Sequence, residues 1–273
     1  MKNVVLGISI NFSVYDLKNL ILSFRRFNQE DDMILFVDPH QIPILKDFFA
    51  KYNVQFKPLC FHDVCDTPIH NSRYIKCLEY LLEHDEYKNV FLCDTKDVVF
   101  QRNVFEGLDG EFLYVFQEDT GAIIYDDMEF NGRWILHAYD NDVLTKLGGQ
   151  NIICSGTILG SYERIVLILS LLKQEMMRIK KERPEIFQGM ILDQVIMNRF
   201  ARLDESTKDL FTVKRSGDIV ATVGISLIHE RLRKDEILIS ETQIMVNGSL
   251  PHVVHQYDRI PVLKELFDKQ YQF

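Results

Sequence analysis

Two aspartates interrupt an apolar stretch at the end of the first third of the chain. In NVFLCDTKDVVFQ, Asp94 follows four apolar residues, and Asp97 comes directly before Val98, Val99 and Phe100. An unpaired carboxylate in apolar surroundings is costly, so each of the two must have a partner. Two carboxylates at a strand end suit a hard divalent cation such as Mg²⁺ or Mn²⁺, which would neutralise a nucleotide diphosphate and stabilise it as a leaving group. The simpler alternative is that Asp94 caps a turn and Asp97 pairs with a surface lysine.

The elements that must position these aspartates follow from hydrophobic periodicity. Continuous apolar runs are typical of strands covered on both faces, whereas apolar residues spaced by three and four indicate helices. The two patterns alternate through the first hundred residues, which predicts a mostly parallel, doubly wound α/β sheet. Ligands of such sheets bind outside the carboxyl ends of the strands, where Asp94 and Asp97 lie. The strands predicted in this part are residues 3–10, 33–38, 54–59 and 89–93, and the helices begin after Ser13, near Pro43 and at Ser72.

The second half of the chain is less regular, but it gives no sign of a separate domain. It contains no internal repeat, no low-complexity segment and no linker rich in Pro, Gly or Ser, so we expect a single domain over residues 1–273. Its predicted strands are 111–119 and 151–160, and its predicted helices are 162–182, 192–202 and a closing helix from about Pro261.

Composition and charge limit the classes of function. The net charge of −9 argues against a broad basic surface for nucleic acid. The five cysteines show neither a CxxC pair nor zinc spacing, which indicates free, mostly buried thiols in a reducing compartment. The N-terminal apolar run is too short for a signal peptide, and no run reaches about 18 apolar residues. We therefore expect a cytoplasmic protein without a membrane span.

Four segments, in order along the chain, resemble the nucleotide-sugar glycosyltransferases of the GT-A fold. In residues 72–101 an arginine-bearing helix leads into a strand that ends in a motif of the D-x-D type. NIICSGTILGS (151–161) resembles the small-residue strand that lines the sugar pocket, and LDQVIMN (192–198) resembles a helix that begins with an Asp-Gln pair. PHVVHQYDR (251–259) resembles the C-terminal segment whose histidine is a further metal ligand. The resemblance covers nearly the whole chain, and DTKDVVFQ together with HQYDR is similar to a subset of bacterial, viral and plant-type transferases.

The resemblance implies a metal site made by Asp94, Asp97 and His255. This chain has D-x-x-D, with Lys96 where the second aspartate of the motif would stand. Asp97 therefore reaches a metal only if the chain turns or bulges after Thr95. We expect Asp97 to bind Mn²⁺ or Mg²⁺, and Asp94 to contact the ribose or the metal, directly or through water. His255 is an imidazole ligand suited to Mn²⁺, or else a structural histidine.

Other residues are implied in donor binding. Arg73 near the start of its helix opposes the helix dipole, which favours an anionic ligand such as a diphosphate. Arg259 is suited to pair with phosphate, or with the adjacent Asp258. Ser9 and Asn11 end the first strand and contact the nucleoside base, or only cap a loop. By resemblance, the donor-binding set comprises Ser9, Asn11, Arg73, Asp94, Thr95, Lys96, Ser155, Gly156, Gln194 and Arg259.

Asp193 and the small residues of the second half each have two interpretations. By resemblance, Asp193 is the catalytic residue near the anomeric carbon, where it acts as general base on the acceptor hydroxyl or steadies developing positive charge. It is also a preferred N-cap for the helix that follows. Ser155 and Gly156 permit close approach of a sugar, or tight packing of strands. The segment around Trp134 covers the acceptor, or belongs to the core.

The function predicted by these residues is a metal-dependent glycosyltransferase of the GT-A, Rossmann-like type. A nucleotide-binding half would span about 1–101, and an acceptor and sugar half about 102–273. The enzyme would move a sugar from a nucleoside diphosphate, of the UDP type, to a hydroxyl of a glycan or other acceptor, with retention of configuration favoured by resemblance alone. Two alternatives stay open. A nucleotidyltransferase would normally carry a Gly-rich phosphate loop, which GISINFSVYD is not. A catalytically inactive module would bind the nucleotide-sugar without turnover. The lack of a membrane anchor favours a bacterial or viral enzyme.

Overall fold

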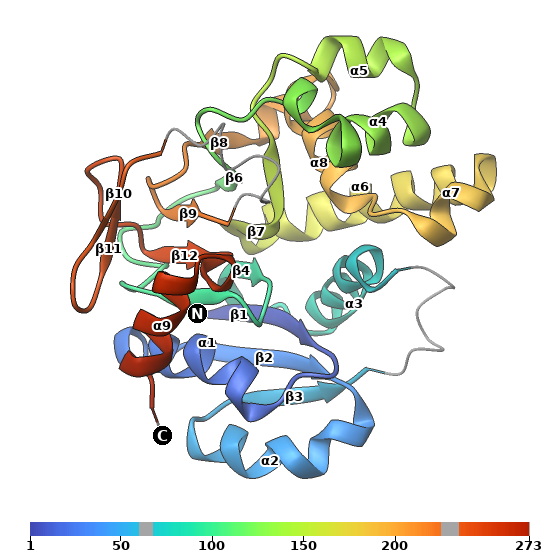
Figure 1. The fold of residues 1–273 in the computed structure, drawn as a ribbon. Helices are drawn as coiled ribbons and strands as arrows, with labels where there is room; N and C mark the ends of the chain where they lie inside the picture. The colour runs from blue at the N-terminus through green and yellow to red at the C-terminus, as the bar shows by residue number, and fades with distance from the viewer. Residues whose placement is uncertain (60–67, 225–234, 273) are drawn as a thin grey trace.

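A mixed, mostly parallel sheet forms the centre of the molecule. The computed structural model describes residues 1–59, 68–224 and 235–272. Neighbouring strands run in the order β3-β2-β1-β4-β7-β6-β8, and only β7 lies antiparallel to its neighbours β4 and β6. Figure 1 shows this sheet running through the molecule with helices on both sides. Its strands are β1 (Lys2–Ser9), β2 (Asp32–Val37), β3 (Gln55–Pro58), β4 (Tyr87–Cys93), β6 (Leu113–Gln117), β7 (Ile153–Ser161) and β8 (Thr212–Lys214).

The helices cover both faces of the sheet because alternate strand residues point to opposite sides. Val4 and Leu6 of β1 belong to a core that also receives side chains from α3, α6 and α8, whereas Val5 belongs to a core formed with α1 and α2 (Figure 1). The predicted doubly wound α/β domain is therefore confirmed. The helices are α1 (Val14–Phe27), α2 (Ile42–Lys51), α3 (Ile69–Glu83), α4 (Arg133–Ala138), α5 (Asn141–Leu147), α6 (Tyr162–Glu182), α7 (Pro184–Gly189), α8 (Asp193–Arg202) and α9 (Pro261–Gln270).

Two small sheets complete the described fold. The strand β12 (Val253–His255) pairs antiparallel with β5 (Val98–Phe100) and parallel with β9 (Val220–Thr222). The strands β10 (Ile237–Ile239) and β11 (Ile244–Val246) form a separate antiparallel pair. The run after Asp97 is thus not a continuation of β4. It belongs to a second sheet that brings the C-terminal part of the chain beside the end of β4 (Figure 1).

One predicted helix start is wrong. The helix α3 begins at Ile69 with Pro68 as its N-cap, so Ser72 lies inside it and does not cap it. Proline suits this position because its fixed φ and missing N–H do no harm at a helix start. Arg73 therefore lies beyond the first helical turn, and the proposed conflict with the helix dipole does not explain its position.

The cysteines and the helices agree with two further expectations. Cys77, Cys93 and Cys154 are buried free thiols, while Cys60 and Cys65 lie outside the described residues. Within the described ranges, no helix combines the length and apolar character needed to cross a membrane.

A bulge interrupts the pairing of β6 with β7 at the edge of the sheet where the predicted site residues lie. Val115 pairs with Ile158, but the next residue, Phe116, pairs with Cys154, so residues 155–157 have no partner on β6. The Asn198 side chain of α8 bonds to both backbone polar groups of Ile153, which lies just before the bulge. It accepts from Ile153 N–H at 2.9 Å and donates to Ile153 C=O at 2.9 Å. Bulges of this kind re-aim side chains beside functional sites.

Replacing Asn198 should therefore destabilise the fold strongly. Asn198→Ala leaves two buried backbone groups of Ile153 unpaired, and we expect the free energy of unfolding to fall by about 2–4 kcal/mol. Urea unfolding measures the change, and Asn141→Ala, at an exposed position in α5, should stay within about 0.5 kcal/mol of wild type. A loss below about 1 kcal/mol for Asn198→Ala would show that β7 does not depend on this side chain.

Candidate active site

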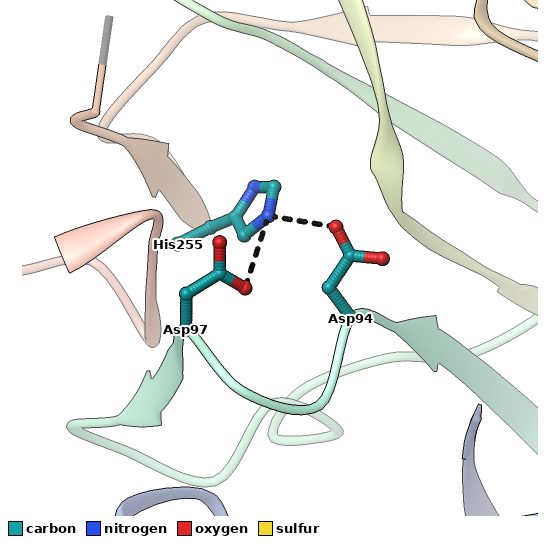
Figure 2. A group of neighbouring side chains, drawn as sticks. All are labelled: Asp94, Asp97 and His255. Atoms are coloured by element: carbon teal, nitrogen blue, oxygen red, sulfur yellow. Dashed lines mark hydrogen bonds and ion pairs between the residues drawn. The ribbon is translucent and has the colours of Figure 1, made fainter. Parts of the chain in front are cut away.

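Three side chains from distant parts of the sequence converge at the carboxyl end of β4. Asp94 follows β4, Asp97 precedes β5, and His255 is the last residue of β12 (Figure 2). His255 Nε2 lies 3.3 Å from Asp94 Oδ2 and 3.8 Å from Asp97 Oδ1. The antiparallel register of β12 and β5 pairs His255 with Val98, which places the imidazole next to Asp97.

The chain bends between the two aspartates, as the D-x-x-D spacing required. Thr95 is buried, and its hydroxyl donates to Ile8 C=O at 2.7 Å, which ties the bend to β1. Gln256 N–H donates to Asp97 C=O at 2.8 Å, and the Tyr257 hydroxyl donates to Lys96 C=O at 3.4 Å. These bonds hold the bend from both sides, and both carboxylates point toward His255 (Figure 2).

Gln256 carries backbone strain at this junction. It adopts φ 61° and ψ 29°, a left-handed conformation that non-glycine residues seldom adopt. Such strain concentrates at functional sites, where the surrounding structure enforces it. Here the left-handed conformation turns the chain directly after His255 and directs the Gln256 N–H toward the carbonyl of Asp97.

The donor set of the three residues suits a divalent cation. The ligand atoms of Asp94, Asp97 and His255 all lie within 4.8 Å of one another, close to the span that one ion bridges. His255 is fully buried, and its Nδ1 faces Thr222 Oγ1 at 3.3 Å and Cys154 Sγ at 3.8 Å. These contacts orient the ring so that Nε2 faces the carboxylates, as a metal-ligating histidine requires.

The electrostatics of the cluster favour a positive charge between the carboxylates. Burial raises the pKa of Asp97 to about 6, and the Asp94 carboxylate adds to the effect. Burial would also raise the pKa of Asp94, but Arg73 and His255 outweigh it and hold that pKa well below its usual range. Burial lowers the pKa of His255, yet Cys154, Asp97 and Asp94 together raise it well above its usual value. The site therefore holds a proton on the imidazole, or a cation in place of that proton.

Gly156 gives this cluster its space. A Cβ atom at this position would lie 2.4 Å from His255 Cε1 and 2.6 Å from Asp94 Oδ2. The Gly156 carbonyl also accepts from Asp94 N–H at 2.8 Å. Gly156, which the sequence predicts to bind the donor, thus lies against His255 and Asp94, two of the three candidate metal ligands.

Arg73 links two carboxylates from different elements. Its guanidinium donates to Asp94 Oδ1 and, at 2.7 Å, to Asp193 Oδ2. It also donates to the Ser155 carbonyl at 3.1 Å and hydroxyl at 3.2 Å. Both terminal nitrogens of the guanidinium are therefore paired within the protein, and Arg73 connects Asp94 to Asp193.

Asp193 is the first residue of α8, and Leu192 is its N-cap. The carboxylate is fully buried, and its second oxygen accepts from Gln194 N–H at 2.8 Å. The side chain of Gln194 accepts from Ser155 N–H at 3.2 Å and donates to Asn131 Oδ1 at 2.9 Å. The Asp-Gln pair thus ties α8 to β7 and to the segment that follows β6.

Glu118 lies at this site but is not among the residues predicted from the sequence. It follows β6, lines the same cavity as Arg73 and Asp94, and accepts from Gln194 Nε2 at 3.3 Å. Burial raises its pKa, and nearby Asp127 adds to the effect. The signal in the sequence is the acidic pair Glu118-Asp119 directly after an apolar strand, the same pattern that marks Asp94.

Two cavities, each of about 290 Å³, meet at this cluster. His70, Arg73, Asp94 and Arg259 line both of them. A wider cavity of about 620 Å³ near Arg215 contains none of the predicted residues. The first of the two joined cavities is also lined by Glu118, Asp127, Phe130, Asn131, Trp134, Ser155, Gly156, Ile191 and Gln194, and the second by Ile8, Ile10, Phe12, Thr95, Lys96 and Asp97.

Most of the predicted donor-binding residues lie at these cavities, but two do not line them. Ser9 is fully buried, and its hydroxyl has no partner among the described residues. Asn11 is exposed, and its backbone N–H donates to Gln41 Oε1 at 2.6 Å. Arg259 is exposed at both cavities, with one guanidinium nitrogen donating to Gly224 C=O at 2.9 Å.

Comparison with solved structures identifies the architecture. The galactosyltransferase LgtC, solved with donor and acceptor sugar analogues, matches with a TM-score of 0.55 over 97% of this chain and 95% of LgtC, at 12% identity. The chain has the GT-A fold. Mouse xyloside xylosyltransferase 1, in its apo form, matches with a TM-score of 0.56 over 93% of this chain and 97% of that enzyme, also at 12% identity. Searches of the sequence against protein-family models and curated proteins found no match.

Gly156→Ala should weaken cation binding without unfolding the protein. The added methyl group would displace His255 or Asp94, and disturbing the support of a metal ligand typically costs about 10–100-fold in affinity. Isothermal titration with Mn²⁺ measures the loss. Gly149→Ala is the matched control, because a Cβ atom there meets nothing within 4 Å. Wild-type Mn²⁺ affinity in Gly156→Ala would remove Gly156 from the cation site.

Cation binding should release a proton, because His255 has a raised pKa and must lose its proton to coordinate. The apparent Mn²⁺ affinity should then fall about tenfold per unit as the pH is lowered, and more steeply below about pH 6, where Asp97 also becomes protonated. Titrations in buffers of different ionisation enthalpy count the released protons. An affinity that does not change between about pH 6 and 8 would contradict the assignment of His255.

Proposed function

We propose that this protein is a metal-dependent glycosyltransferase that moves a sugar from a nucleoside diphosphate, of the UDP type, to a hydroxyl acceptor. The observation that carries the proposal is the cluster of Asp94, Asp97 and His255 at the junction of two cavities. Such a junction suits a ligand with two dissimilar parts joined by an anionic group. A nucleotide-sugar has this form.

The second cavity fits the nucleoside. Ile8, Ile10 and Phe12 provide an apolar wall for the base, and exposed Lys96 and Arg259 provide positive charge near the junction. The diphosphate would lie where the two cavities meet, with Arg259 positioned for charge-assisted hydrogen bonds. Asp94, Asp97 and His255 would hold Mn²⁺, which when bound neutralises the diphosphate as a leaving group.

The first cavity fits the sugar and the acceptor. Ser155, Gly156 and Gln194 form its inner end beside Asp94. In the transfer, the acceptor oxygen bonds to the anomeric carbon and the bond from that carbon to the diphosphate oxygen breaks. The nucleoside diphosphate leaves with the electron pair, and the hydroxyl proton passes to a basic oxygen of the site.

The catalytic role of Asp193 stays a prediction. Its carboxylate is fully buried and paired with Arg73, whereas the Glu118 carboxylate lines the cavity. The charge of Asp193 would then act on the sugar through the position of Arg73 and the start of α8. Glu118 is the better placed of the two to accept a proton from a hydroxyl.

A panel of nucleotide-sugars, screened by thermal shift with and without Mn²⁺, tests the function. A donor at 100 times its dissociation constant should add about 2.7 kcal/mol to the free energy of unfolding. Asp97→Asn should abolish the Mn²⁺-dependent part because it removes one ligand charge. Asp47→Asn, exposed on α2, should behave as wild type.

Products distinguish the remaining possibilities. Release of free sugar and nucleoside diphosphate from the bound donor, with anomeric retention read by NMR, supports a retaining glycosyltransferase. Formation of pyrophosphate from a nucleoside triphosphate and a sugar phosphate would instead indicate a nucleotidyltransferase. Tight donor binding without any turnover would indicate a module that only binds the nucleotide-sugar. If no nucleotide-sugar binds in a Mn²⁺-dependent manner, the proposal is refuted.

A further inference from the structure

One wall of the sugar cavity is built by a segment with unusual helical geometry. After β6 the chain forms the 3-10 helix η3 (Ile124–Asp127) and then the π-helical turn η4 (Met128–Gly132). The helix α4 follows, and Figure 1 shows it beside α8. Single π-turns are rare and are frequently found at functional sites. This turn brings Phe130 and Asn131 to the cavity together with Trp134 from the first turn of α4.

The wall formed by this segment is aromatic. The rings of Phe130 and Trp134 meet edge to face with centroids 5.8 Å apart. Phe130 is 38% exposed, and Trp134 packs against the core on one side but is partly exposed, so each ring keeps some accessible surface. Large aromatic surfaces left open beside a polar site are suited to the apolar face of a ligand.

The rest of the same cavity is polar. Gln194 Nε2 donates to Glu118 Oε1 at 3.3 Å and to Asn131 Oδ1 at 2.9 Å, and Asp127 accepts from the Asn131 side chain at 2.5 Å. These bonds fix the orientation of Glu118 and Asn131. Among the described residues, the donor found for the Glu118 carboxylate is Gln194 Nε2, on Oε1, which leaves the second oxygen able to accept a bond from a hydroxyl.

We infer that the acceptor is a carbohydrate whose ring packs against Trp134 while its hydroxyls face Glu118; this inference rests on the proposed glycosyltransferase function. A pyranose ring has an apolar C–H face and a rim of hydroxyls, and this cavity offers a surface for each. An aliphatic chain would bury the Glu118 carboxylate without a donor, at a cost. A serine side chain supplies a hydroxyl but no face to cover Trp134.

The tryptophan fluorescence of this protein comes from Trp134 alone, because the chain contains one tryptophan. With UDP and Mn²⁺ present, a sugar ring on Trp134 should shield its fluorescence from quenching by acrylamide. The probes are methyl glycosides of glucose, galactose, N-acetylglucosamine and xylose, compared with cyclohexanol and a capped serine peptide. We expect shielding only by the glycosides that accept sugar, with half-effect near their KM.

Substitutions separate stacking from general damage. Trp134→Ala should raise the KM for the accepted glycoside about tenfold or more, the scale known for removing an aromatic ring that stacks on a nucleic-acid base. Trp134→Phe should recover most of that loss. Leu136→Ala is the matched control, since Leu136 is 39% exposed on the same helix but does not line the cavity.

The outcomes are distinct from those that test the function itself. Saturating transfer without shielding of Trp134, an unchanged KM in Trp134→Ala, or transfer only to the alcohol or peptide overturns the carbohydrate assignment. The carbohydrate assignment is also overturned if the donor is hydrolysed but no glycoside accepts the sugar or shields Trp134. The proposed function is tested without any acceptor, by Mn²⁺-dependent donor binding and hydrolysis, and its failure there would refute both proposals.

Discussion

A buried arginine paired with two carboxylates organises the candidate site. Arg73 comes from α3, Asp94 from the end of β4 and Asp193 from the start of α8, and Arg73 also bonds to Ser155 of β7. A charge removed from water is strongly destabilising unless it is paired. These four elements can therefore approach one another only in an arrangement that pairs both terminal nitrogens of Arg73. That arrangement places Ser155 and Asp94, which line the same cavity, beside Asp97 and His255.

The same balance of charge explains why the cluster remains compact. Asp94 interacts with two positive groups at once, Arg73 on one oxygen and His255 on the other. Asp97 has His255 as its nearest positive neighbour and a carboxylate close by, which accounts for the opposite direction of its pKa shift. Two aspartates of the same motif thus differ in chemistry. Asp94 is anchored in the protein framework, whereas Asp97 gains most from an added cation.

The sheet and the place of Asp94 and Asp97 at its edge were predictable because their signals are local. Apolar runs mark β1, β2 and β4, and the polar pattern after β4 marks Asp94 and Asp97. The start of α3 differs from the prediction because the helix begins three residues before Ser72, with Pro68 as its N-cap. The partners of Arg73, the contact of Gly156 with His255 and the place of Glu118 in the cavity depend on pairings between distant segments, for which periodicity carries no information.

The position of β12 in the chain has a consequence for synthesis. His255 lies 161 residues after Asp94, and β12 is the middle strand of its small sheet, between β5 and β9. The strands β1 to β4 all lie before residue 94 and can pair while the later part of the chain is still being translated. The cluster of Asp94, Asp97 and His255 has no such early form, because His255 is translated 161 residues after Asp94. A nascent chain can thus bury part of its core before these three side chains can meet.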